Sequence, residues 1–106
     1  MPKYLVHGNY VGEGINGLLA EGGTSRVEAI NNLVESLGGY VESIYYAFGD
    51  TDIYGIVDMP DHASMTAFAL TASSSGRVTV STTVLMTPEE IDAAAGLSPN
   101  YRASGE

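Results

Sequence analysis

The stretch YVESIYYAFGDTDIYGIVDM, residues 40–59, decides the fold of this chain. Two runs rich in strand-forming residues, 40–48 and 52–59, flank the turn-forming letters GDTD. Gly and Asp are typical of tight chain reversals, because Gly adopts backbone angles closed to other residues and Asp hydrogen-bonds its own backbone. The stretch therefore predicts two antiparallel strands joined as a hairpin.

Working outward from this hairpin, we expect one helix and one strand on each side of it. Residues 3–10 (KYLVHGNY) form a strand-like run, and residues 12–37 carry apolar residues at helical spacing. After the hairpin, Asp61 is a suitable N-cap for a helix, and residues 77–86 alternate valine with threonine or serine. The order β-α-β-β-α-β predicts an α+β fold of the ferredoxin-like type, with a four-stranded antiparallel sheet and helices on one face.

A short helix is predicted after the last strand. Residues 87–90 (TPEE) combine an N-cap, a proline at the first helical position and a capping-box glutamate, and Gly96 is expected to end the helix. We therefore expect residues 1–96 to form a single domain. Residues 97–106 are expected to form a loose tail in which Tyr101 is the main candidate to pack.

Charge and composition exclude several classes of partner. Thirteen acidic and four basic residues give a formal net charge of −9, and the basic residues are far apart in sequence: Lys3, Arg26, Arg77 and Arg102. A phosphate backbone needs clustered cations, so nucleic acid and anionic membrane surfaces are poor partners. The sequence has no cysteine, no recognisable signal peptide and no run of about 20 apolar residues, so we expect a cytoplasmic protein.

A glycine-rich segment, GGTSR at residues 22–26, interrupts the first predicted helix. Free N–H groups in such a segment can bind phosphate at a helix start. The alternative is a simple break, because one helix over residues 13–37 would be about 37 Å long and would overrun the strands. Ser25 and Glu28 have the spacing of a capping box, which would start a new helix at Arg26. Since Glu28 would also repel an anion, we favour the break.

Alternation along the strands predicts two different faces of the sheet. The face toward the helices is expected to carry Val6, Ile44, Tyr46, Phe48, Ile53, Gly55, Val57, Val78, Val80 and Val84. The opposite face is expected to carry Leu5, His7, Asn9, Tyr45, Tyr54, Ile56, Thr83 and Leu85. Glu42 falls on the apolar helix side in this register. The opposite face is too apolar to lie bare in water, so we expect a homodimer or higher oligomer that pairs sheet against sheet.

Five blocks of the sequence are distinctive: MPKYLV (1–6), EGGTSR (21–26), LVESLGG (33–39), YAFGDTDIYGIVDMPD (46–61) and TTVLMTPEEIDAA (82–94). Together they resemble the bacterial GYD domain family. The resemblance extends from residue 1 to about residue 95 and implies a ferredoxin-like protein of the dimeric α/β-barrel type, with no established activity to carry over. Where the family has a Gly-Tyr-Asp pattern, this chain reads Gly49-Asp50-Thr51-Asp52, without the tyrosine.

His7 is the main candidate for chemistry. It lies in the middle of the first predicted strand with Asn9 beside it, and Tyr45 and Tyr54 are expected nearby. An imidazole next to phenols in an apolar pocket can act as a general base, or it can make a fixed hydrogen bond across a dimer interface. We expect a module that binds a small apolar or aromatic molecule, or that simply assembles. The alternative is a cofactor-independent monooxygenase or isomerase with His7 as general base.

Two acidic groupings have a structural interpretation beside a functional one. His62 follows Asp58 and Asp61, but a zinc site usually needs three or four converging ligands, and Asp61 is better explained as an N-cap. Asp50 and Asp52 resemble an acid–base pair, but an exposed turn would leave both ionised. We therefore expect no metal site and no cofactor.

Overall fold

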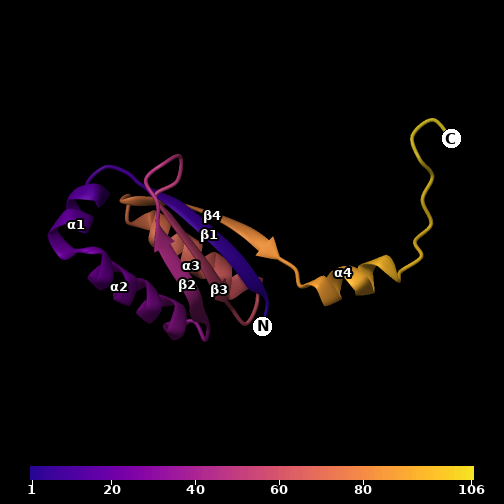
Figure 1. Ribbon diagram of the computed structural model, residues 1–106, viewed down its shortest axis with the longest axis horizontal. Helices are drawn as coiled ribbons and strands as arrows, with labels where there is room; N and C mark the ends of the chain where they lie inside the picture. Colours follow the sequence, from indigo (N-terminus) through magenta and orange to yellow (C-terminus); the bar gives the residue numbers. More distant parts are fainter.

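The computed structural model describes residues 1–106 and has the predicted ferredoxin-like order of elements, followed by a C-terminal helix (Figure 1). The four antiparallel strands form one sheet in the order β2-β3-β1-β4. No helix is both long enough and apolar enough to cross a membrane. The elements are β1 (Lys3–Tyr10), α1 (Gly14–Glu21), α2 (Gly23–Ser36), β2 (Tyr40–Tyr46), β3 (Ile53–Asp58), α3 (His62–Ser74), β4 (Val78–Leu85) and α4 (Pro88–Ala95).

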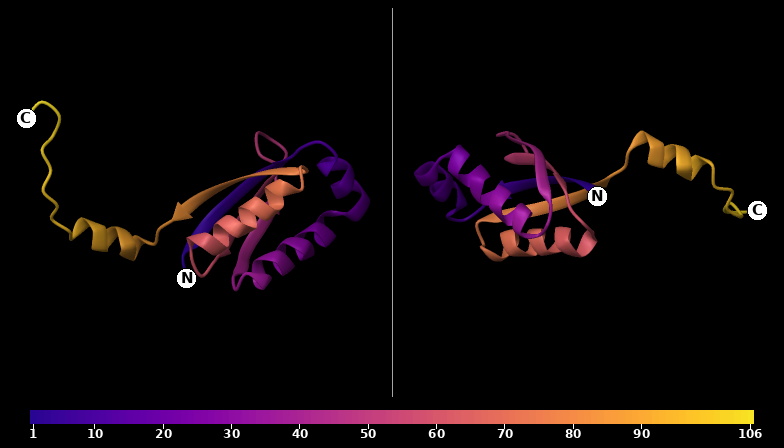
Figure 2. Two further views of the ribbon diagram at one scale, coloured as in Figure 1. Left: turned by 180° about the vertical axis from the view of Figure 1, so that it is seen from behind. Right: turned by 90° about the horizontal axis from the view of Figure 1, so that it is seen from below.

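Two helices cover one face of the sheet. Seen from behind, α3 crosses in front of the strands and α2 runs along the side of β2 (Figure 2). The predicted N-cap of α3 is confirmed, because the Asp61 carboxylate accepts a hydrogen bond of 2.8 Å from the Ser64 N–H. The core beneath these helices is small, since only 10 of the 106 residues are buried. Its hydrophobic members are Tyr4, Val34, Val57, Met59, Met65 and Phe68.

The first predicted helix is broken into α1 and α2, as favoured above, but the position and cause of the break differ from the prediction. The backbone turns at Gly22, whose φ of 85° is rarely adopted by other residues. Consequently α2 begins at Gly23 and not at Arg26, and Ser25 lies inside the helix without forming the expected cap. Packing also favours Gly23, because a Cβ there would lie 3.1 Å from the ring of Tyr46, which would have to shift by a few tenths of an ångström.

The predicted alternation of the strands is confirmed for most positions. The face toward α2 and α3, called the helix face, carries Val6, Ile44, Ile53, Gly55, Val57, Val78 and Val80. The other, called the open face, carries Leu5, His7, Asn9, Tyr45, Tyr54, Ile56, Thr83 and Leu85. Phe48 was expected on the helix face, but it follows the end of β2 and is exposed, with its ring stacked on that of Tyr46.

The expected placement of Glu42 on the helix face is wrong, because β2 contains a bulge. Val41 pairs with Val57 and Ser43 pairs with Ile56, so Glu42 is an extra residue between two pairs. Its carboxylate is therefore free to bind the Lys3 ammonium group at 2.7 Å. The bulge removes a charge from the core and re-aligns the apolar residues on either side of it.

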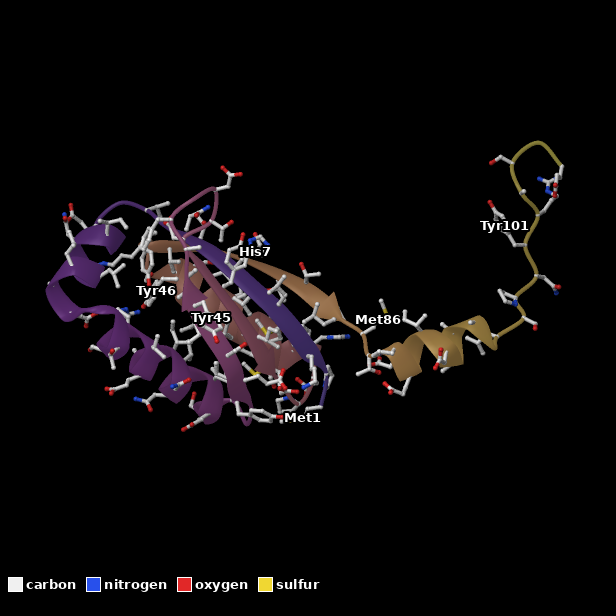
Figure 3. The ribbon with its side chains drawn as sticks, in the orientation of Figure 1. Met1, His7, Tyr45, Tyr46, Met86 and Tyr101 are labelled. Atoms are coloured by element: carbon white, nitrogen blue, oxygen red, sulfur yellow. The ribbon has the colours of Figure 1, made fainter.

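The last twenty-one residues, called the C-terminal arm (residues 86–106), extend away from the sheet (Figure 1). The radius of gyration is 17.2 Å, whereas a compact domain of this length has about 13 Å. The predicted capping box of α4 is confirmed, with Thr87 and Glu90 bonded to each other's backbone N–H groups. The expectation that Tyr101 packs is wrong for the single chain, because Tyr101 is 81% exposed at the far end of the arm (Figure 3).

Candidate functional site

An apolar cavity of about 260 Å³ lies on the helix face, between the sheet, α2 and α3. It exists because α2 packs against β2 and α3 packs against β4, which are the two edge strands. The central strands β3 and β1 are left as its floor. Side chains that line it include Val6, Ile44 and Val57 from the sheet, Ile30 and Leu33 from α2, and Phe68 from α3.

Small residues at three facing positions keep this cavity open. Ala29 of α2, Gly55 of β3 and Ala72 of α3 all line it. A Cβ placed on Gly55 would make only ordinary contacts, the nearest at 3.4 Å to the Ser43 carbonyl oxygen. The backbone therefore does not require glycine at this position. Ligand cavities commonly measure about 300–1,000 Å³, and this one, at about 260 Å³, lies just below that range and limits a ligand to a small size.

The end of the cavity near the start of α2 is polar. Tyr10 and Arg26 both line the cavity, and Arg26 is the only charged residue that does so. Burial, together with a hydrogen bond that Tyr10 donates to Tyr46, raises the pKa of Tyr10 to about 12, and the nearby Arg26 opposes this rise. The Tyr46 hydroxyl in turn donates to the Gly23 carbonyl oxygen at 3.1 Å. The Arg26 Nη1 atom also contacts the Glu21 carboxylate, at 3.3 Å.

The side chains predicted to form the site lie on the open face, and of these residues only His7 also borders the cavity, from the floor strand β1. The rings of His7 and Tyr54 are stacked, with centroids 6.0 Å apart, and Tyr54 pairs with Tyr45 on the next strand. These three residues therefore come together, as expected from alternation. Tyr45 is 74% exposed and Tyr54 41% exposed, so the surface is open in the single chain (Figure 3). A role for His7 as base or ligand-binding group stays a prediction.

Asn9, the fourth predicted site residue, is hydrogen-bonded to the loop between β2 and β3. Its side-chain oxygen accepts a hydrogen bond of 3.1 Å from the Asp52 N–H, and the Asp52 carboxylate accepts one of 2.9 Å from the Tyr10 N–H. These bonds attach the loop between β2 and β3 to β1. The structural interpretation of Asp52 as a turn residue therefore accounts for its contacts.

The histidine and aspartates near the start of α3 have separate partners. The His62 ring hydrogen-bonds the Tyr4 hydroxyl, and Asp61 caps α3. Asp58 is buried and binds the Lys3 ammonium group at 2.9 Å on the open face. No group of three or more His, Asp or Glu side chains is placed to hold a metal ion.

Sequence reasoning missed the cavity and its polar end. Arg26 lies in the GGTSR segment that the sequence singled out, but there the backbone N–H groups, and not the arginine side chain, were considered for anion binding. No feature of the sequence singled out Tyr10 as a site residue, because an aromatic residue at the end of a strand commonly packs in the core. The available signal was the small size of Ala29, Gly55 and Ala72 at positions that face the core.

No curated protein and no solved structure shows significant similarity to the chain. The family comparison does give a match, to the GYD domain. It covers residues 4–95, which extend from within β1 to the last residue of α4 and so include the sheet, the cavity and both faces described above. The chain therefore belongs to the GYD domain family.

Proposed function

We propose that this GYD domain binds a small, largely apolar molecule in the cavity between the sheet, α2 and α3. The observation that supports the proposal is the apolar volume of about 260 Å³ in a domain that buries only 10 residues. Concave sites lined mainly by apolar side chains, with a few polar groups at one end, are typical of small-molecule binding. A ligand that binds only the folded chain would also stabilise the fold.

The proposal is tested by filling the cavity with a side chain. Ala72→Phe places a ring in the cavity from α3, and Gly55→Val reduces the same space from the sheet. We expect each variant to bind the neutral fluorescent probe N-phenyl-1-naphthylamine at least about tenfold more weakly than the unmodified chain, because the probe loses the buried apolar contacts. The matched control is Ala63→Phe, which adds the same ring on an exposed position of α3.

Circular dichroism and thermal unfolding establish whether each variant is folded. A folded Ala72→Phe or Gly55→Val variant that binds the probe as tightly as the unmodified chain would contradict the proposal. Weaker binding by Ala63→Phe as well would assign the probe to the outer surface of α3 and would also contradict it.

We also propose that two copies of the chain pair through their open faces. Leu5, Tyr45, Tyr54 and Ile56 form an apolar and aromatic surface that no element of the same chain covers. The C-terminal arm supports the proposal independently, because all eight residues of α4 are exposed. A helix of this length is only marginally stable alone in water, and a second copy would offer it a surface to pack on.

A further inference from the structure

We propose that the molecule bound in the cavity is an amphiphilic carboxylate, such as a medium-chain fatty acid or a small aromatic acid. Its apolar part would fill the space beneath α2 and α3, and its carboxylate would be held by the Arg26 guanidinium group and the Tyr10 hydroxyl. This inference rests on the proposed binding function and assigns the chemistry of the polar end of the ligand.

The distribution of charge around the cavity favours a ligand with an anionic end. The chain has 13 acidic residues and a net charge of −9, yet none of the acidic residues lines the cavity. The single charged side chain that does line it is a cation, Arg26. A wholly apolar ligand would remove water from this guanidinium group and leave it with Glu21 as its one anionic partner, and desolvation of a charge is unfavourable. A ligand with an anionic end would add a second anionic partner for Arg26 inside the cavity.

The ion pair of Arg26 shows that a carboxylate fits beside it. The Glu21 carboxylate lies 3.3 Å from Nη1, with the side chains of Arg26 and Glu21 respectively 37% and 48% exposed. Exposed pairs of this kind contribute little to stability, so the guanidinium group is held loosely by Glu21. A guanidinium group has five N–H donors in a planar fork. It can therefore bind a ligand carboxylate on its cavity side, with or without release of Glu21.

Tyr10 provides a second donor at the same end. Its side chain lines the cavity and lies beside Arg26. The phenol is protonated over the physiological pH range, and its one O–H is shared with Tyr46, whose own hydroxyl donates to the Gly23 carbonyl oxygen. A bound carboxylate would take this O–H from Tyr46. The cavity thus has an apolar body and one end where Arg26 and Tyr10 can donate to the same ligand group.

The test compares two ligands that differ only at the polar end, decanoate and decanol. Both are titrated against the full chain in competition with N-phenyl-1-naphthylamine, at a salt concentration that screens the net negative charge. We expect decanoate to bind about tenfold more tightly than decanol, because a charge-assisted hydrogen bond is roughly twice as strong as a neutral one. Arg26→Met keeps the aliphatic stem of the side chain and is expected to abolish this preference.

Arg102→Met is the matched control, since it makes the same change in net charge in the C-terminal arm. It should leave the preference for decanoate unchanged. Equal affinities of the unmodified chain for decanoate and decanol would overturn the assignment of the polar end while leaving ligand binding in the cavity intact. A preference that survives Arg26→Met would overturn the role of Arg26. If decanoate, decanol and the probe all fail to bind, both the inference and the proposed function are wrong.

Discussion

The helix face and the open face of the sheet are built from the same four strands, but they differ in cover and in chemistry. On the helix face, α2 and α3 cover a core and flank a partly open cavity of about 260 Å³ whose only charged lining residue is Arg26. On the open face, His7, Tyr45 and Tyr54 lie side by side on three neighbouring strands without a covering element. The histidine and tyrosine side chains that stand out in the sequence therefore lie on the open face, whereas the cavity lies on the helix face.

This difference shows that reactive residue types and enclosed volume are separate pieces of evidence for a site. Histidine and tyrosine are noticed in a sequence because their side chains carry chemistry. Enclosed volume depends on what is missing, and here the small side chains of Ala29, Gly55 and Ala72 leave the space. Three predictions test how sharply the two faces differ.

The largest effect is expected from the core of the helix face. Met59 is fully buried, and Met59→Ala should lower the free energy of unfolding by about 3 kcal/mol, through lost burial and the cavity that it leaves. Leu70→Ala, on the exposed side of α3, is the control and should change it by less than about 0.5 kcal/mol. Urea unfolding at several protein concentrations measures both variants. Similar losses for the two variants would mean that the core is not where the burial pattern places it.

The open face should control assembly and not the fold of the single chain. Ile56 lies on this face in the central strand β3. Ile56→Lys would bring like charges together across paired sheets and should weaken dimerisation by about a hundredfold. Light scattering at micromolar concentration measures this, with Ala63→Lys on the exposed side of α3 as the control. A monomeric unmodified chain at these concentrations would remove the basis for pairing through the open face.

The smallest effect concerns the response of stability to alkaline pH. The pKa of Tyr10 is about 12 in the folded chain and about 10 in an unfolded chain. The unfolded state therefore loses this proton first as pH rises, so the stabilising contribution is complete below about pH 10 and is lost progressively toward about pH 12. Tyr10→Phe should reduce the alkaline loss of stability.

The matched control for this titration is Tyr101→Phe, which removes an exposed phenol from the C-terminal arm. It should leave the slope of unfolding free energy against pH unchanged, when both variants are followed by urea unfolding from about pH 9 to pH 11. An identical slope for Tyr10→Phe and the unmodified chain would show that Tyr10 is not buried at the cavity end.

Part of the candidate site could be predicted from the sequence, and part could not. The proximity of His7, Tyr45 and Tyr54 followed from strand alternation and the hairpin, which are properties of short stretches. The cluster of Tyr10, Arg26 and Tyr46 did not, because its members come from β1, α2 and β2 and meet only through packing. Neither residue type nor local spacing indicates such a meeting.

The order of the elements, the hairpin and the caps at Asp61 and Thr87 were determined by the sequence itself, because each depends on residues close together in the chain. The tertiary structure decided the bulge at Glu42, whose carboxylate has the distant Lys3 as its partner. It also decided the position of the cavity. That position depends on which strands the two helices pack against, and only long-range contacts set this arrangement.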